Sequence, residues 1–172
     1  MIPQRIVEYL ESHAVPYERR LHRRAITAQD LAATVHVPGR RVAKSVIVEA
    51  DRQIWIAVLP ATEVVDEKRL AAVLDASTVR LLPEWEFEAL FPDCEPGAEP
   101  PFGGLFGLPV VIDSTLAGSD RIVFRAGSHE EAIEMRYDDF YELENGAITG
   151  VIGHARASTP AVWTEWPEPT AR

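Results

Sequence analysis

The chain has little of several features that secreted, membrane and metal-dependent proteins rely on. It has one cysteine in 172 residues, which excludes a disulfide framework and is typical of a reducing compartment, so a cytoplasmic protein is expected. No apolar run reaches the roughly 18 residues that would cross a bilayer. The first residues are amphipathic and do not form a signal-peptide core, so no membrane partner is expected.

Common catalytic and metal-binding motifs are also missing. The sequence contains no GxxxxGK[ST] phosphate loop, no GxGxxG, no HExxH and no GxSxG elbow. Its five histidines are scattered without metal-ligand spacing, so a zinc site is not expected. Cys94 lies between Asp93 and Glu95, whose carboxylates oppose thiolate formation and make it a poor nucleophile.

Lysine is nearly absent, and one of the two lysines stands in an unusual place. The chain has fifteen arginines but only Lys44 and Lys68. Lys44 lies in a strand-like run and shares a strand face with Val42, Val46 and Val48, because strand side chains alternate. Lysine offers a compact ammonium with a tunable pKa that arginine lacks, which favours a functional cation here. A lysine snorkelling from a strand end is the open alternative.

Charge is unevenly distributed along the chain. The overall net charge is −10, which argues against a polyanionic partner. Residues 1–44, however, hold eight basic and four acidic residues, a balance of +4, whereas residues 45–172 hold nine and twenty-three, a balance of −14. The asymmetry can leave one positive face for phosphates, with a solvated arginine-rich loop as the alternative. The basic residues concerned are Arg19, Arg20, Arg23, Arg24, Arg40, Arg41 and Lys44.

Length and hydrophobic pattern predict one α/β (α+β) domain with a mixed, largely antiparallel sheet and flanking helices. The domain is expected over residues 1–148, followed by a C-terminal tail over 149–172 that includes Trp163 and Trp166. Helices are predicted at 2–12, 27–34, 66–74, 83–90 and 137–143. Strands are predicted at 42–49, 54–59, 78–82, 110–113, 121–126 and 132–135, the first two as a hairpin with a central second strand.

Two connections have a composition suited to ligand binding. Residues 96–104 are rich in proline and glycine, so the loop is stiff, permits close backbone approach and could offer N–H groups to a carbonyl. An ordinary long connection is the alternative. The turn around Gly127, Ser128 and His129 could present a hydroxyl and an imidazole, although a solvent-facing hairpin turn is the commoner explanation.

Several short motifs follow one another in an order that resembles a known family. They are Val42-Ala43-Lys44-Ser45, Gly97-x-x-x-Pro101-Phe102-Gly103, Val111-Ile112-Asp113, Ala126-Gly127-Ser128-His129 and Ile133-Glu134-Met135. Across residues 2–145 the chain resembles the YbaK/prolyl-tRNA-synthetase-associated editing domain in its free-standing form.

This resemblance implies hydrolysis in trans of mischarged aminoacyl-tRNA, usually tRNA(Pro) carrying Ala, Cys, Ser or Thr, without a metal or cofactor. It implies that Lys44 is the essential lysine, holding the 3′-terminal adenosine end as a cation, and that the Gly97–Pro101 loop orients the aminoacyl group. Pro100, Pro101 and Phe102 are expected to wall the pocket. The other expected substrate-binding residues are Ser45, Gly103, Asp113, Gly127, Ser128 and His129.

The acidic surface predicts weak intrinsic tRNA affinity, so recruitment by an aminoacyl-tRNA synthetase or an elongation factor is a further hypothesis. The alternative function is a non-catalytic module or regulator that binds an aminoacyl-like or nucleotide-like ligand on the same fold, because fold does not fix function.

Overall fold

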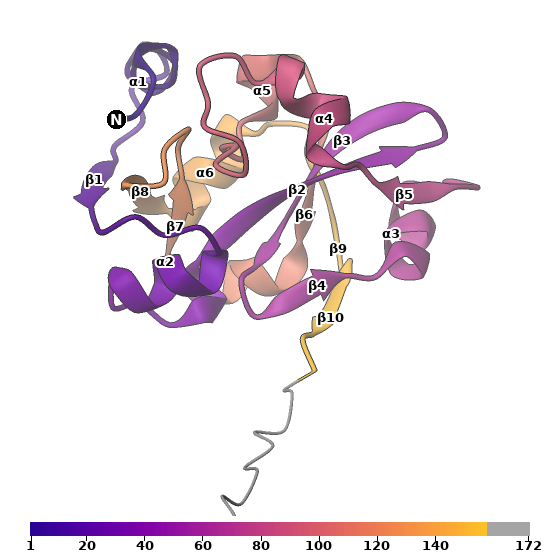
Figure 1. Cartoon of the computed structure of the whole chain (residues 1–172). Helices are drawn as coiled ribbons and strands as arrows, with labels where there is room; N and C mark the ends of the chain where they lie inside the picture. Colours follow the sequence, from indigo (N-terminus) through magenta and orange to yellow (C-terminus); the bar gives the residue numbers. More distant parts are fainter. Residues whose placement is uncertain (158–172) are drawn as a thin grey trace, which may run out of the picture.

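A five-stranded mixed sheet organises the fold in the computed structural model, which describes residues 1–157 (Figure 1). Its strand order is β5-β2-β3-β6-β9, with β2 (Ala43–Ala50), β3 (Gln53–Pro60), β5 (Val79–Leu81), β6 (Val110–Asp113) and β9 (Ile148–Gly150). β2 pairs antiparallel with β3 and β5, whereas β6 pairs parallel with β3 and β9. The predicted α/β class with a mixed sheet is confirmed.

The predicted hairpin forms β2 and β3. The two strands pair over their full length from Ala43 opposite Pro60 to Ala50 opposite Gln53. Asp51 and Arg52 make the connection with φ of 46° and 68°, the positive values that a tight hairpin turn needs. β3 lies at the centre of the sheet and its last five residues are buried, as its two apolar faces predict.

Two smaller sheets complete the β structure. β1 (Glu18–Leu21), β8 (Glu131–Arg136) and β7 (Arg121–Arg125) form an antiparallel sheet in the order β1-β8-β7. A bridge between Val42 and Val123 connects β7 to the residue that precedes β2. β4 (Glu63–Val65) pairs antiparallel with β10 (Gly153–Ala155).

Helices cover the sheets, and their ends follow local sequence signals. Thr27 caps α2 (Ala28–Thr34) in a reciprocal capping box with Asp30, and Asp66 caps α3 (Glu67–Leu74). The other helices are α1 (Gln4–Ser12), α4 (Glu84–Phe87), α5 (Gly103–Phe106) and α6 (Tyr137–Leu143), with 3-10 turns at Gly39–Arg41, Glu88–Leu90 and Ser114–Gly118. No helix within residues 1–157 is both long enough and apolar enough to span a bilayer.

The main core lies between the five-stranded sheet, α1 and α6. Ile6, Leu10, Phe102, Phe124 and Phe140 are fully buried or nearly so in it. A second cluster lies under α2, and a third lies between β2, β3 and α3. The small second cluster matters for function because its residues border the cavity described below.

The ordered sheet extends further along the chain than the composition suggested. Residues 148–155, placed mostly in the expected tail, contribute β9 and β10, which pair with β6 and β4. The short strand β4 was also not predicted. Trp163 and Trp166 lie outside the described residues.

Candidate functional site

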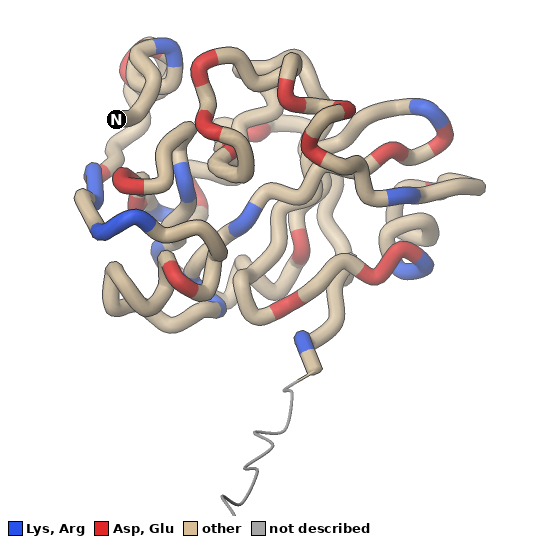
Figure 2. The backbone as a smooth tube through the Cα atoms, viewed as in Figure 1, with Lys and Arg blue, Asp and Glu red and all other residues tan. Residues whose placement is uncertain are grey.

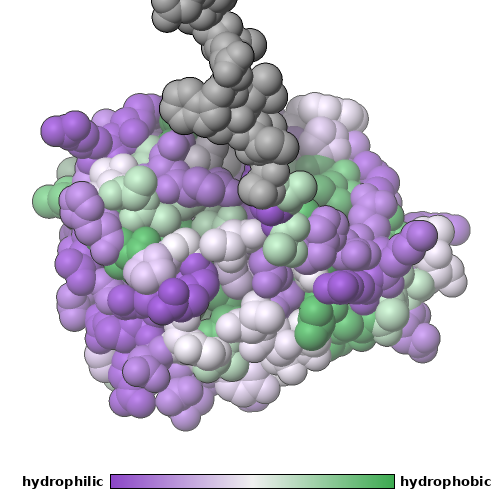
Figure 3. Space-filling view, turned by 90° about the horizontal axis from the view of Figure 1, so that it is seen from below, coloured by the Kyte–Doolittle hydropathy of each residue, from purple (hydrophilic) through white to green (hydrophobic). Residues whose placement is uncertain are grey.

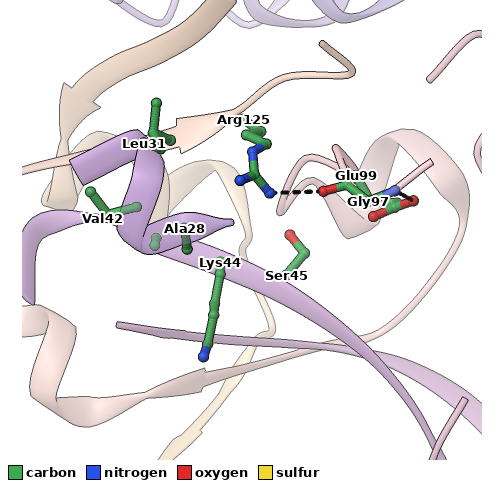
Figure 4. A pocket seen from close by; sticks show the side chains of 9 residues that line it. Ala28, Leu31, Val42, Lys44, Ser45, Gly97, Glu99 and Arg125 are labelled. Carbon is green, nitrogen blue, oxygen red and sulfur yellow. Dashed lines mark hydrogen bonds between the residues drawn. The ribbon is translucent and has the colours of Figure 1, made fainter. Parts of the chain in front are cut away.

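A small cavity lies where α2, β2, β7 and the loop 96–99 meet (Figure 4). Its volume is about 30 Å³. Nine residues line it, namely Ala28, Leu31, Val42, Ala43, Lys44, Ser45, Gly97, Glu99 and Arg125. Three of the residues predicted from the sequence therefore meet here, because Gly97 lies beside the adjacent Lys44 and Ser45 although more than 50 positions separate it from them along the chain.

Lys44 and Ser45 are adjacent on β2 and point in opposite directions. Figure 4 shows the Ser45 hydroxyl on the side of Arg125 and Glu99, while the Lys44 ammonium points away from them. Strand alternation explains this geometry, because consecutive side chains leave opposite faces of a sheet. Lys44 shares its face with Val46 and Val48, as predicted, and both valines pack in the third cluster.

The Lys44 ammonium is half-buried and meets a neutral partner. Nζ donates a hydrogen bond to the main-chain carbonyl of Glu63, its only hydrogen bond within residues 1–157. Burial lowers the pKa of Lys44 to about 8, and the positive charge of Arg156 adds to this effect. Burial and the nearby Asp113 raise the pKa of the Glu63 carboxyl. The lysine is thus a cation of reduced basicity with no carboxylate ion pair among the described residues.

The loop 96–99 is held by its own hydrogen bonds. The Gly97 amide donates to Glu99 Oε1 at 2.9 Å, and the Ala98 amide donates to the carbonyl of Glu95 at 2.9 Å. The expectation that this loop offers free N–H groups to a carbonyl is wrong for these two amides. Gly97 has a φ of +79°, which requires glycine for the turn.

Arg125 and Glu99 line the cavity and were not identified from the sequence. Arg125 Nη1 donates to the Gly97 carbonyl at 2.9 Å, while its Nε and Nη2 are buried without a partner in residues 1–157. Burial lowers the pKa of Arg125 and raises that of Glu99. Arg125 directly precedes the Ala126-Gly127-Ser128-His129 motif, and Glu99 lies inside the glycine-proline loop. Their closeness to these motifs is the one sequence feature that could have pointed to them.

The turn at Gly127, Ser128 and His129 supports the loop and does not line the cavity. The Gly127 amide donates to the Ala98 carbonyl at 2.8 Å. Both imidazole nitrogens of His129 face carbonyl oxygens, with Nδ1 3.2 Å from Ala25 O and Nε2 2.8 Å from Pro96 O. The Ser128 hydroxyl accepts the N-terminal ammonium at 3.2 Å and the Glu130 amide at 3.2 Å. None of the three residues lines the cavity, and all three are buried, so the turn does not face solvent.

The expected walls of the pocket lie elsewhere. Phe102 is fully buried in the main core, where its ring meets Phe124 edge-on at 5.2 Å between centroids. Pro100 and Pro101 are also buried and do not border the cavity. Gly103 begins α5, and its amide donates to Glu144 Oε2 at 3.0 Å. Apolar α2 residues, Ala28 and Leu31, take the place of these walls.

Asp113 stabilises the end of the sheet. Its carboxylate is fully buried and accepts the Ile152 and Gly153 amides at 2.9 and 3.0 Å. It also accepts the amide and hydroxyl of Thr115 at 2.9 and 2.6 Å. Asp113 therefore lies outside the cavity, and its carboxylate oxygens accept hydrogen bonds from groups of the protein itself.

Cys94 is unsuited to nucleophilic chemistry, as predicted. Burial raises the pKa of its thiol to about 12, and the negative charge of Glu99 contributes. The sequence-based reason, the flanking carboxylates, is secondary to burial. Within residues 1–157 no group of histidine, cysteine, aspartate and glutamate residues has the arrangement of a metal site.

Most of the arginine cluster is neutralised by acidic residues that are distant in the sequence. Arg20, Arg41 and Arg121 all pair with Glu134, while Arg19 pairs with Glu131. Figure 2 shows basic and acidic segments close together around β1. Arg24 pairs with Glu95. Arg23 and Arg40 make no ion pair within residues 1–157, so the free positive charge is smaller than the sequence balance indicated.

The surface beneath the sheets is of mixed polarity. Where grey atoms leave it visible, Figure 3 shows apolar side chains as separate spots among hydrophilic ones. Such a mixture is ordinary for a protein surface.

Solved structures share this fold. The hypothetical protein APE2540 superposes with a TM-score of 0.78 at 17% identity, covering 87% of this chain and 99% of that one. A candidate trans-editing enzyme for prolyl tRNA synthetase gives 0.75 at 17% identity, covering 88% and 96%. A candidate signal transduction protein from Marinobacter aquaeolei VT8 gives 0.71 at 15% identity, covering 89% of this chain but 31% of that one.

The sequence itself matches a family. No curated protein matches the chain. The aminoacyl-tRNA editing domain family, however, matches residues 22–143, which is more than half of the chain. This segment contains the whole cavity, from Ala28 on α2 to Arg125 on β7. The chain therefore belongs to the aminoacyl-tRNA editing domain family.

Proposed function

We propose that this protein hydrolyses mischarged aminoacyl-tRNA in trans, with tRNA(Pro) carrying Ala, Cys, Ser or Thr as the substrate class. The observation that carries the proposal is the cavity shared by the Lys44–Ser45 strand and the Gly97 loop. It lies inside the segment that matches the editing family. Its small volume suits a small aminoacyl side chain and opposes the larger ring of proline, which is the sieving that editing requires.

The reaction needs positioning more than a strong catalyst. Water attacks the ester carbonyl, the bond to the ribose oxygen breaks, and the free amino acid and the uncharged tRNA leave. Because an aminoacyl ester is already activated, held geometry and a few dipoles can supply the rate. This accounts for an enzyme without a nucleophile: Cys94 is held as a thiol and Ser128 is buried in the N-terminal contact.

Lys44 is proposed to act as a cation and not as a nucleophile. Its hydrogen bond is accepted by a neutral carbonyl, so its charge is available to a phosphate or to the ester of the 3′-terminal adenosine. The ammonium lies on the opposite face of β2 from the Ser45 hydroxyl. We therefore place the nucleotide end on the Lys44 side and the amino acid on the Ser45 side of the strand.

A charged-tRNA panel tests the function directly. Wild-type protein and Lys44→Ala are incubated with tRNA(Pro) carrying Ala, Cys, Ser, Thr or Pro, and release of the amino acid is followed. Lys68→Ala is the matched control, because Lys68 is the other lysine and is exposed on α3. We expect hydrolysis of one or more mischarged species, sparing of Pro-tRNA, and loss of activity only in Lys44→Ala. Equal activity in both variants would contradict the role of Lys44.

Recruitment by a synthetase or an elongation factor is proposed as well. Net charge is −10 and most arginines of the cluster are paired, which predicts weak unaided tRNA binding. Tight binding of uncharged tRNA at physiological salt by the protein alone would contradict this part of the proposal.

A binding module is the second candidate function. It is favoured by the occurrence of the same fold as less than a third of a candidate signal transduction protein. In this case the wild-type protein would bind an aminoacyl-adenosine ligand but hydrolyse none of the charged tRNA species. The only effect of Lys44→Ala would be a lower affinity for that ligand.

A further inference from the structure

The cavity has two chemically different walls. One wall is apolar and comes from α2 and the start of β2, with Ala28, Leu31, Val42 and Ala43. The other wall is polar and comes from Ser45, Glu99 and Arg125. A ligand group that fills this space must therefore present carbon on one side and a polar atom on the other.

The polar wall holds hydrogen-bond donors that the protein leaves unused. Arg125 Nη1 donates a hydrogen bond to the Gly97 carbonyl at 2.9 Å, and this bond holds the guanidinium in place. Its Nε and Nη2, together with the Ser45 hydroxyl oxygen, are buried and have no partner within residues 1–157. Buried polar groups without partners cost free energy, so a site that retains three of them is suited to a ligand that satisfies them.

The size of the cavity limits that ligand group. A volume of about 30 Å³ accommodates one or two water molecules or a group of similar size. A hydroxyl with an attached methyl or methylene fits this description, whereas a ring or a long chain does not.

The surrounding charges favour a neutral group over an anion. The carboxylates of Glu99 and Asp30 both act electrostatically on Arg125. A ligand carboxylate would add a third negative charge near one guanidinium. A hydroxyl avoids that repulsion, because it accepts from Arg125 and can donate its own proton to Glu99, which lines the same wall.

We propose that Arg125 and Ser45 form the side-chain subsite of the editing site and select small hydroxylated residues, serine and threonine, over alanine and valine. The inference rests on the proposed function for the identity of the ligand, but it is carried by the unused donors and the volume of the cavity. Arg125 and Ser45 act here as specificity-determining residues that contact the side chain.

Binding of non-hydrolysable analogues tests the subsite without requiring turnover. The probes are 3′-amino-3′-deoxyadenosine amides of threonine, valine, serine and alanine, measured by calorimetry. Threonine and valine have nearly the same shape, so their ratio isolates the hydroxyl. One satisfied hydrogen bond corresponds to roughly tenfold in affinity, so we expect the threonyl amide to bind about tenfold or more tightly than the valyl amide.

Variants of Ser45 and Arg125 test whether these two residues cause the preference for the threonyl amide. Ser45→Ala removes a hydroxyl that makes no hydrogen bond within residues 1–157, so the fold should tolerate it. We expect it to reduce the threonyl-to-valyl ratio about fivefold to tenfold, and Arg125→Leu to reduce it at least as much. Ser77→Ala, at an exposed serine in the turn before β5, is the matched control and should keep the wild-type ratio.

The outcomes separate this inference from the proposed function. Equal binding of the threonyl and valyl amides, or an unchanged ratio in Ser45→Ala, would overturn the subsite. A clear hydroxyl preference without hydrolysis of any charged tRNA would support the subsite and overturn the hydrolase.

Discussion

The Arg125 guanidinium donates a 2.9 Å hydrogen bond to the carbonyl of Gly97, joining β7 to the glycine-proline loop. The two residues are 28 positions apart in the chain. Both residues line the cavity, and Arg125 does so on the side of the Ser45 hydroxyl, with two guanidinium nitrogens that have no partner within residues 1–157. A loop fixed in this way can present a preformed site, which lowers the cost of ordering it when a ligand binds.

Activity that depends on the Lys44 ammonium should fall as pH rises through about 8. The pKa of Lys44 is lowered to about 8, so the side chain is charged below that pH and neutral above it. The rate of deacylation, corrected for hydrolysis in buffer alone, is measured from pH 6 to pH 10. Lys44→Ala should lose on the order of 100-fold in rate, as removal of a charge-stabilising donor does. A corrected rate that still rises above pH 9 would exclude the ammonium as the active form.

Asp113→Asn should destabilise the fold. The substitution replaces a fully buried carboxylate that accepts four hydrogen bonds with an amide whose nitrogen cannot accept them. A loss of about 3 kcal/mol in the free energy of unfolding is expected from urea denaturation. Asp120→Asn, at an exposed position, is the control. Wild-type stability combined with lost activity would instead assign Asp113 to the site.

Glu144→Gln should stabilise the protein at neutral and alkaline pH. Burial raises the pKa of Glu144 to about 7, from its ordinary value of 4.5. Because the folded-state pKa is raised, the wild type is most stable below pH 4.5 with respect to this group and loses stability as pH rises towards 7. Urea denaturation at pH 8 should favour the variant by up to roughly 3 kcal/mol, and the difference should vanish near pH 4.5. A difference independent of pH would contradict the assignment.

Gly127→Ala should cost more stability than Gly107→Ala. Both glycines have positive φ, +78° and +68°, so each alanine is strained by about 1 kcal/mol. At Gly127 a Cβ would also lie 2.6 Å from Pro3 Cδ, whereas at Gly107 it meets nothing within 4 Å. Overpacking adds about 1 to 3 kcal/mol at Gly127 alone. If both variants lost the same free energy of unfolding in urea denaturation, Pro3 and the N-terminal segment would have moved aside without an energetic penalty.

Arg23→Ala and Arg40→Ala should weaken tRNA binding at low salt. These arginines make no ion pair within residues 1–157, so their charges are available to phosphates. Each substitution should lower the slope of log affinity against log salt by about 1. Arg52→Ala should leave the slope unchanged, because Arg52 lies in the β2–β3 turn, at the opposite side of the molecule from β1 in Figure 1. An equal effect at Arg52 would indicate a diffuse charge effect without a defined surface.

Local structure and family membership could both be predicted from the amino-acid sequence. The elements predicted from short-range signals are present. These signals are the strand-like run of β2, the run of β3 that is apolar on both faces, the Thr27–Asp30 capping box and the apolar stripe of α1. The motif order around Lys44 and Gly97 likewise placed the chain in its family, because a motif needs no spatial neighbour to be recognised.

Which residues line the cavity depends on contacts that form only in the folded chain. Phe102 and Asp113 were expected in the pocket, yet the Phe102 ring packs in the main core and the Asp113 carboxylate accepts backbone amides at the start of β10. Arginine side chains usually lie on the solvated surface, yet the hydrogen bond from Arg125 to the Gly97 carbonyl holds this one at the cavity. Glu134 neutralises three arginines that precede it in sequence by as many as 114 positions. Burial and charge pairing depend on neighbours that only folding brings together, which is why composition could not supply them.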